Sequence, residues 1–279
     1  MTTISVTAPT VATPVPRPTG LAGPGTTAAV FAGRTLRQFR RTPQLIVVGA
    51  LTSAMFLLIF RYVFGGAIGT GEVSYVDFLI SGLAAGGALF TGTGAAVGVA
   101  EDVDSGMFDR LRSLPIPRSA VLLGRSLADT ALVAWGLSIT VALGFATGFR
   151  IHDGVPSALA ALGLCVVFGF AFTWPFILMG LVAGNAQAAQ GLSLLAFPFV
   201  FVSSAYVPVD SMPGWMQPIA ENQPLTPMIG AVRSLVLGDG AEATLGHSTG
   251  WFVLRALLWS AAIVAVFMPL ATRRFARSN

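Results

Sequence analysis

The side chains that most often do chemistry in proteins are scarce in this chain of 279 residues and lie far apart. It has two histidines, His152 and His247, and a single cysteine, Cys165, which lies within an apolar run. A structural zinc site normally needs four such ligands, so the sequence predicts no metal site and no catalytic group. The lone cysteine can form no internal disulfide and fits a small core position. We therefore expect a non-catalytic protein.

Acidic residues gather where one long apolar run ends, at Glu101, Asp102 and Asp104. Four further charges lie inside or beside apolar runs: Arg61, Asp77, Asp129 and Arg255. Charged groups in lipid are functional candidates by default. Each of these four lies near the end of its run, however, and a side chain that reaches the membrane interface explains it more simply. No acid lies in the middle of a run, where a proton or ion relay would need one.

All 16 basic residues are arginines, because the chain contains no lysine. The glycine-rich loop of a P-loop ATPase ends in a lysine that holds the nucleotide phosphates. An ATP-driven process would therefore need another subunit to bind ATP and magnesium, and we expect this chain to bind no cofactor. The arginines cluster at the ends of apolar runs, which is the pattern of membrane topology and not of nucleic-acid binding.

The elements that hold these residues are apolar helices. The chain is 54% hydrophobic and 10% charged, whereas a typical soluble domain has about 25% charged residues. Lipid offers no partner to free backbone groups, so apolar runs of about 20 residues must be helical. We place six of them at about 44–64, 77–100, 129–149, 156–184, 189–208 and 250–272. The sequence predicts an all-α integral membrane protein with six transmembrane helices.

Details of the runs refine this prediction. The fourth run contains Trp174-Pro175 and can be one tilted or kinked helix or two half-spans. Small residues recur four apart, which favours close helix packing; the pairs are Gly82 and Gly86, Gly94 and Gly98, Gly144 and Gly148, and Gly180 and Gly184. Residues 1–27, rich in Thr, Pro, Ala and Gly, predict a disordered tail. Residues 28–279 then form one transmembrane domain.

The arginines also predict the orientation. With a cytoplasmic N-terminus, every arginine lies on the inner side except Arg61, Arg150, Arg233 and Arg255. The positive-inside rule therefore places both termini in the cytoplasm. An even number of spans satisfies this arrangement, and six is even.

Two amphipathic helices are predicted on the inner side. The first, over 28–41, carries Arg34, Arg37 and Arg41 on one face and aromatic residues on the other, as a helix at the membrane surface does. A plain solvated helix is the alternative. The second lies in the loop 101–125, where four apolar residues form one stripe: Met107, Phe108, Leu111 and Leu114. Such a helix suits docking into a groove on a partner protein, or it lies passively on the lipid headgroups.

The segment between the fifth and sixth runs is broken by prolines. Thr226-Pro227 can begin a helix and Gly238 can end it. The apolar stretch between them is too short to cross a bilayer, which predicts helices that dip into the membrane and return, with Trp215 at headgroup depth. A folded cap outside the membrane is the alternative.

Two stretches resemble the membrane subunit of type II ABC exporters, in the daunorubicin-resistance-like branch of bacterial multidrug efflux permeases. The inner loop carries Glu101, Gly106, Leu111, Pro115 and Gly124 of the likeness. The outer segment carries Met212-Pro213, Trp215, Gln217-Pro218, Asn222, Pro224-Leu225 and Arg233. The order of elements agrees across about residues 28–279.

The resemblance implies a site for each function. Contact with the ATPase falls to Glu101, Gly106, Met107, Phe108, Leu111, Leu114, Pro115 and Arg118, and to the surface helix with Arg34, Arg37 and Arg41. An outer gate falls to Trp215, Pro224 and Arg233. The implied partners are two cytoplasmic ATPase subunits, a second copy of this chain or a homologous permease, and the lipids of a bacterial plasma membrane, with no nucleic acid.

We therefore expect a permease subunit that exports an amphipathic or lipophilic substrate. Our expectation for the pathway lining is Phe197, Phe199, Phe201 and Tyr206, although phenylalanines in a span also commonly face lipid or core. One rival function is a transporter or channel that runs on an ion gradient, which the lack of mid-span acids disfavours. The other is a membrane enzyme that modifies lipids, which the two isolated histidines disfavour.

Overall fold

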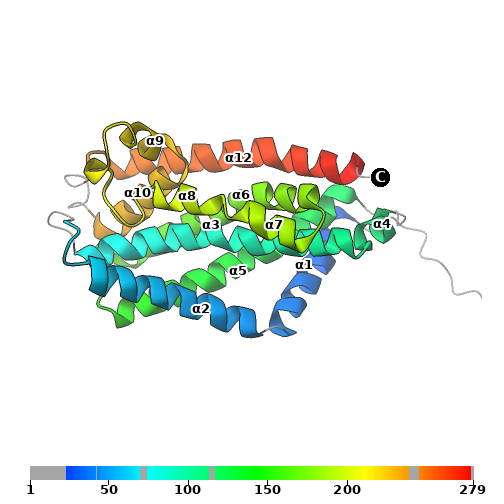
Figure 1. The fold of residues 1–279 in the computed structure, drawn as a ribbon, viewed down its shortest axis with the longest axis horizontal. Helices are drawn as coiled ribbons and strands as arrows, with labels where there is room; N and C mark the ends of the chain where they lie inside the picture. The colour runs from blue at the N-terminus through cyan, green and yellow to red at the C-terminus, as the bar shows by residue number, and fades with distance from the viewer. Residues whose placement is uncertain (1–22, 42, 70–73, 113–116, 239–244, 278–279) are drawn as a thin grey trace, which may run out of the picture.

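The computed structural model describes residues 23–41, 43–69, 74–112, 117–238 and 245–277, and within these ranges every regular element is helical. The helices form an elongated bundle (Figure 1). Five of them are long and apolar enough to cross a membrane. They are α2 with η1 (Pro43–Leu58 and Ile59–Phe64), α3 (Tyr75–Asp104), α5 (Arg118–Ala146), α6 (Gly154–Ala183) and α12 (Thr249–Arg277). The prediction of an all-α membrane protein is confirmed.

The longest helices exceed the membrane. At about 1.5 Å per residue, a helix of 30 residues such as α3 or α6 is longer than the roughly 30 Å of hydrocarbon that it crosses. Of the two readings of the fourth run, the structure has one continuous helix, α6, with Pro175 inside it. The first span changes to a π-helix over its last six residues, η1, which contains Arg61.

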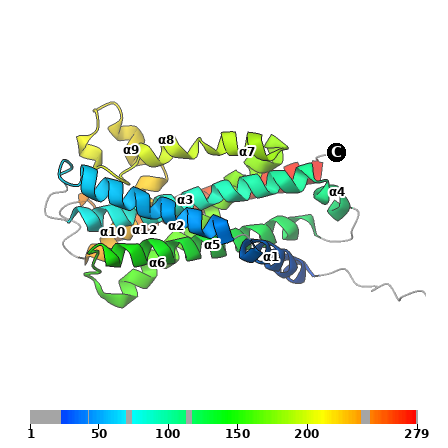
Figure 2. The same cartoon turned by 60° about the horizontal axis from the view of Figure 1, so that its bottom comes forward.

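The predicted fifth span differs from the single helix that we expected. It consists of α7 (Ala186–Ser193) and α8 (Ala196–Phe201), which follow one another along α3 (Figure 2). Pro198 has no N–H to donate to the carbonyl of Leu194, which removes one helical hydrogen bond at this point. The N–H of Phe197 donates to Leu194 O instead, at 3.0 Å, which makes a tighter turn. The chain therefore passes along the bundle as two half-helices.

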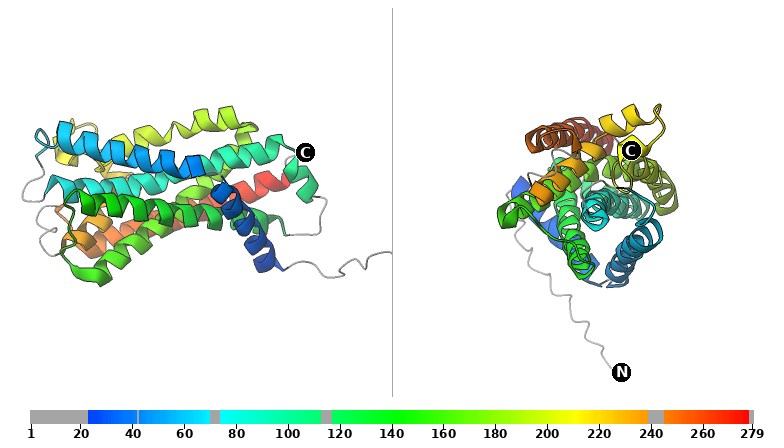
Figure 3. Two further views of the ribbon diagram at one scale, coloured as in Figure 1. Left: turned by 90° about the horizontal axis from the view of Figure 1, so that it is seen from below. Right: turned by 90° about the vertical axis from the view of Figure 1, so that its left-hand side faces the viewer.

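Short helices mark the two ends of the bundle (Figures 1 and 3). One end carries α4 (Met107–Arg112) and the last turn of α12, with α1 (Pro24–Arg41) lying obliquely across the long helices. The opposite end carries η2 (Val209–Ser211), α9 (Gln217–Asn222) and α10 (Leu225–Leu237). We call them the α4 end and the α9 end. The first described element, α1, and the last turn of α12 lie at the same end.

Helix α3 lies at the centre, packed against α5, α6, α7 and α10. Glycines permit the closest approaches. A Cβ placed on Gly180 of α6 would overlap the backbone of Ala96 in α3, and one on Gly82 would overlap the carbonyl of Ala205, which follows α8. Two of the predicted small-residue positions thus bring backbones together where lipid supplies no hydrophobic drive. Gly184 serves differently, as the left-handed residue that ends α6.

Candidate functional site

A network of four charged side chains lies at the α4 end. Asp102, in the last turn of α3, accepts two hydrogen bonds from Arg34 of α1. The donors are Nη2, at 3.0 Å, and Nη1, at 3.4 Å. Arg125 of α5 approaches the same carboxylate, with 3.7 Å between Nη1 and Oδ2. Its Nε donates to Asp129 Oδ2 at 3.0 Å, one turn along α5. One carboxylate therefore joins arginines from two other helices.

Glycines make room for this network. The Nη2 of Arg125 donates to the carbonyl of Gly94 at 3.3 Å, and a Cβ on Gly98 would overlap the guanidinium. Gly94 and Gly98 are one of the predicted packing pairs, and here they form a groove on α3 that holds a charged side chain instead of another helix backbone. Asp129 was expected to reach the interface, but it is buried and its charge is balanced by Arg125. Two cations and two anions leave the network neutral, which lowers the cost of burying it.

Helix α4 is attached directly beside the network. Gly106, at φ +65°, provides the left-handed turn that reverses the chain after α3. Phe108 is buried, and its ring meets that of Phe275 in α12 edge-on at 4.8 Å. Met107 and Phe108 also line a shallow hollow at this end together with Phe31, Arg34, Thr35, Val99, Asp102, Val121, Leu122 and Arg125. At least one residue of the predicted docking stripe, Phe108, therefore packs into the bundle.

The remaining predicted coupling residues are less fully placed. Glu101 is exposed in the last turns of α3, and Leu111 and Arg118 lie in α4 and in the first turn of α5. Leu114 and Pro115 lie outside the described residues. Of the three arginines predicted on one face of α1, Arg34 turns toward α3. Arg37 donates to Gly33 O of its own helix at 3.1 Å, and Arg41 is exposed at the end of α1.

At the α9 end one arginine is buried without a carboxylate. Arg233 of α10 is 2% exposed and forms no salt bridge with any described residue. Its Nη2 donates to the carbonyls of Phe78 and Ser204, each at 3.0 Å, and its guanidinium carbon lies 3.5 Å from the centre of the Phe78 ring. The cation thus ties α10 to the first turn of α3 and to the turn that follows α8.

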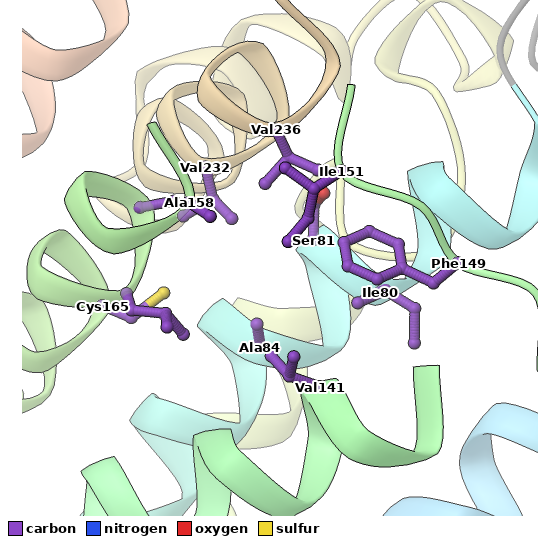
Figure 4. A pocket seen from close by; sticks show the side chains of 12 residues that line it. Ile80, Ser81, Ala84, Val141, Phe149, Ile151, Ala158, Cys165, Val232 and Val236 are labelled. Atoms are coloured by element: carbon purple, nitrogen blue, oxygen red, sulfur yellow. The ribbon is translucent and has the colours of Figure 1, made fainter. Parts of the chain in front are cut away.

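The other two predicted gate residues also lie at the α9 end, but no contact joins them to Arg233 among the described interactions. Pro224 is buried immediately before α10, whereas Trp215 is exposed in the turn before α9. Helix α10 packs against α3, α6 and α12, level with their ends. Beneath it lies an apolar cavity of about 40 Å³ (Figure 4), lined by residues that include Ile80, Ala84, Val141, Cys165 and Val232.

The aromatic residues predicted to line a pathway divide into two kinds. Phe197, Phe199 and Phe201 of α8 are exposed, whereas Tyr206 is buried. The ring of Tyr206 stacks on Phe60 of the first span at 4.3 Å. Phe197 meets Phe90 of α3 at 4.9 Å. These contacts join α8 to α3 and the turn after α8 to the first span, and they leave the three phenylalanines of α8 partly uncovered.

The other three charges that were expected to reach the interface each form a hydrogen bond within the protein. That Arg61 and Arg255, both half-buried, also reach the interface stays a prediction. Asp77 is buried and accepts a hydrogen bond from the backbone N–H of Arg150 at 3.1 Å. Arg61 donates to the carbonyl of Thr147, and Arg255 donates to Asn222 Oδ1 at 3.1 Å. Sequence reasoning allowed the acidic cluster with Asp102 to pair with nearby arginines or to be solvated, but it did not name Arg34 and Arg125 as the partners. The signal that could have found part of the network is the spacing of four between Arg125 and Asp129, which places both on one helix face.

This architecture defines a multi-pass helical membrane protein, with a short helix between two spans at one end and a buried short helix before the last span at the other. The family model for ABC-2 type transporters matches residues 28–237. The chain belongs to the ABC-2 type transporter family, and it is an ABC transporter permease.

Curated relatives agree with this assignment. The chain is 33% identical to the daunorubicin resistance ABC transporter permease protein DrrB1 of Streptomyces coeruleorubidus, over 88% of this chain and 84% of that protein. It is 27% identical to a Mycobacterium tuberculosis protein named "Probable doxorubicin resistance ABC transporter permease protein DrrC", over 91% of this chain and 92% of that protein.

Proposed function

We propose that this chain is the membrane subunit of an ATP-driven exporter that moves an amphipathic or lipophilic substrate outward. The observation that carries the proposal is the position of α4, a six-residue helix between the spans α3 and α5. The last turn of α3 and the first turns of α5 are joined by the ion pair between Asp102 and Arg125. A separate ATPase that pressed on α4 would thereby move α3 and α5. Because the chain has no lysine for a P-loop, ATP and magnesium belong to that partner.

The proposed assembly has two permease chains and two ATPase subunits in a bacterial plasma membrane, with both termini in the cytoplasm. The α4 end then faces the cytoplasm and the α9 end faces outward. Closure of the ATPases around nucleotide displaces α4, and the tilt of α3 and α5 changes the packing at the α9 end, where α10 and Arg233 act as an outer gate. The second copy is either identical to this chain or homologous to it.

The substrate class follows from the surface and from the relatives. The exposed phenylalanines of α8 offer flat apolar contacts, which suit a molecule that also dissolves in lipid. The two relatives described above are named for resistance to daunorubicin and doxorubicin. We propose that Phe197, Phe199, Phe201 and Tyr206 contact the substrate or the partner permease along this face. An ion-gradient mechanism is not favoured, because the buried carboxylate of Asp129 is already paired with Arg125.

Co-expression with a candidate ATPase tests the proposal. We expect the ATPase to co-purify with the wild-type permease, and the double variant Leu111→Asp, Leu114→Asp to lose it while the permease still inserts into the membrane. A matched control, Gly214→Asp with Ser248→Asp, adds the same charge at exposed positions of the α9 end and should retain the ATPase.

Normal co-purification of the Leu111 and Leu114 variant would show that α4 is not the docking helix. Export that continues without any ATPase, and that stops when ion gradients are dissipated, would refute the ATP-driven function itself.

A further inference from the structure

We propose that Asp102 is a positioning residue that fastens α1 and α5 to the end of α3, so that the three helices move as one body when α4 is displaced. The proposal rests on the function proposed above. It concerns a residue that the pattern of the sequence did not single out from its neighbours Glu101 and Asp104.

The first step of the argument is the place of Asp102 beside the turn to α4. Ser105 N donates to Glu101 O at 2.9 Å, and Ser105 Oγ contacts the carbonyl of Asp102 at 3.3 Å. Gly106 N donates to Val103 O at 3.1 Å, immediately before α4 begins. The hydrogen bonds of this turn thus all fall on the last turns of α3. A displacement of α4 therefore acts first on the part of α3 that carries the Asp102 carboxylate.

The second step is that contacts between α1, α3 and α5 close a triangle. A Cβ on Gly124 of α5 would overlap the carbonyl of Ala28, so α1 and α5 touch backbone to backbone. Arg125 lies in the groove of α3 and joins α5 to α3. Arg34 joins α1 to α3, and both arginines meet on Asp102. Loss of this one carboxylate would remove an ion pair from two of the three sides, and on the α1–α3 side it would remove both hydrogen bonds of Arg34.

The third step is the gradient of exposure along the network. The side chain of Arg34 is 41% exposed and that of Asp102 is 14%, whereas Arg125 is 12% and Asp129 is 3% exposed. The outer link can be weakened by water and salt, while the inner pair is shielded. Asp102 belongs both to the exposed link with Arg34 and to the shielded part of the network around Arg125. Its neighbours Glu101 and Asp104 are exposed. Of the three acids in this cluster, Asp102 is the one that the structure builds into the contact between helices.

The experiment uses the full permease with its ATPase partner in lipid nanodiscs. We expect Asp102→Asn, which keeps the shape and removes the charge, to lower daunorubicin-stimulated ATP hydrolysis by about 5- to 10-fold, the lower end of typical coupling between sites. Basal hydrolysis and co-purification of the ATPase should stay near the wild-type level. Asp102→Glu should recover most of the stimulation, and the matched control Asp104→Asn should behave as the wild type.

A distance measurement tests the rigid body without any ATPase. In a Cys165→Ala background, spin labels at Leu36→Cys on α1 and Asp104→Cys on α3 should give one narrow distance distribution. Asp102→Asn should broaden it, and Arg34→Gln, which removes the outer link alone, should broaden it less. This readout also covers the case in which no ATPase binds the wild type, because that result would refute the proposed function and leave the tie to be judged by the distances.

Three results would overturn the inference. Asp102→Asn could keep full stimulation and a narrow distribution, which would make the carboxylate dispensable. It could lose the ATPase from the complex, which would make Asp102 a docking residue instead of a positioning one. Asp102→Glu could fail to recover any stimulation in a protein that folds and inserts normally, which would assign the effect to shape and not to charge.

Discussion

Arg125 at the α4 end and Arg233 at the α9 end are both largely buried, but they meet different partners. Arg125 lies between two carboxylates, Asp102 and Asp129, in a network that also reaches Arg34. Arg233 meets two backbone carbonyls and the face of an aromatic ring. Arg125 thus joins charged side chains of three helices, besides its bond to the carbonyl of Gly94, whereas Arg233 meets no carboxylate among the described residues. Under the proposed function, the α4 end would transmit movement from the ATPase and the α9 end would hold the outer gate closed.

The largest effect that we expect comes from Arg125→Leu. The substitution leaves the 3%-exposed Asp129 without its cation, and breaking a buried pair in this way costs about 3–5 kcal/mol. Thermal unfolding of the purified permease in detergent measures the loss. The double variant Arg125→Leu, Asp129→Leu removes both charges and should recover most of the stability. If the double variant is no more stable than the single one, the network does not balance charge as described.

Arg233→Ala should cost somewhat less, about 2–4 kcal/mol, because it opens a cavity and leaves the Ser204 carbonyl without its donor. No second substitution should rescue it, since no carboxylate pairs with Arg233 among the described residues. The unfolding temperature of the purified variant measures this loss. Arg150 is exposed, so Arg150→Ala serves as the control and should change the unfolding temperature little. If Arg233→Ala and Arg150→Ala lower the unfolding temperature equally, Arg233 has no special structural role and the two ends do not differ as described.

Two glycines on α3 should respond with opposite signs. Gly82→Ala places a methyl group on the carbonyl of Ala205, and displacing the broken fifth span should cost about 1–3 kcal/mol. Gly87→Ala, which meets open space on the same helix, should gain up to about 1 kcal/mol from its better helix propensity. Unfolding curves of the two variants side by side decide the matter. The same sign for both would mean that Gly82 does not seat the segment after α8.

The smallest effect belongs to Arg34→Gln. Because the Arg34 side chain is 41% exposed, its pair with Asp102 should contribute only about 0–1 kcal/mol. The difference from the wild type should also shrink as salt is raised, since salt screens exposed charges. Unfolding at low and high ionic strength measures this. A large effect that salt leaves unchanged would show that the outer link is shielded as well as the inner pair.

The sequence predicted the membrane-length helices, because apolar runs of this length have one stable form in lipid. It did not predict the break in the fifth span, although Pro198 was visible, since hydropathy alone continues through the proline. The spacing of Gly94 and Gly98 indicated close packing, but it could not show that a guanidinium and not a helix fills the groove.

The pairing of Arg34 with Asp102 joins residues 68 positions apart, and no local pattern records such a contact. Helical periodicity assigned Arg34 to a surface face of α1. Only the fold decides that this face meets the end of α3. The Arg125–Asp129 pair, by contrast, lies within one turn of a helix and was readable in principle.

The division of the fifth span into α7 and α8 provides a point at which the backbone can act as a hinge. Leu194 and Leu195, between α7 and α8, lie outside both α-helices. Pro198 has no N–H, so one further helical hydrogen bond is missing here. Rotation about a few backbone bonds there can swing α8 with its phenylalanines while α7 stays seated on α3. The work of bending at this point is torsional, and no intact helix has to be unwound to perform it.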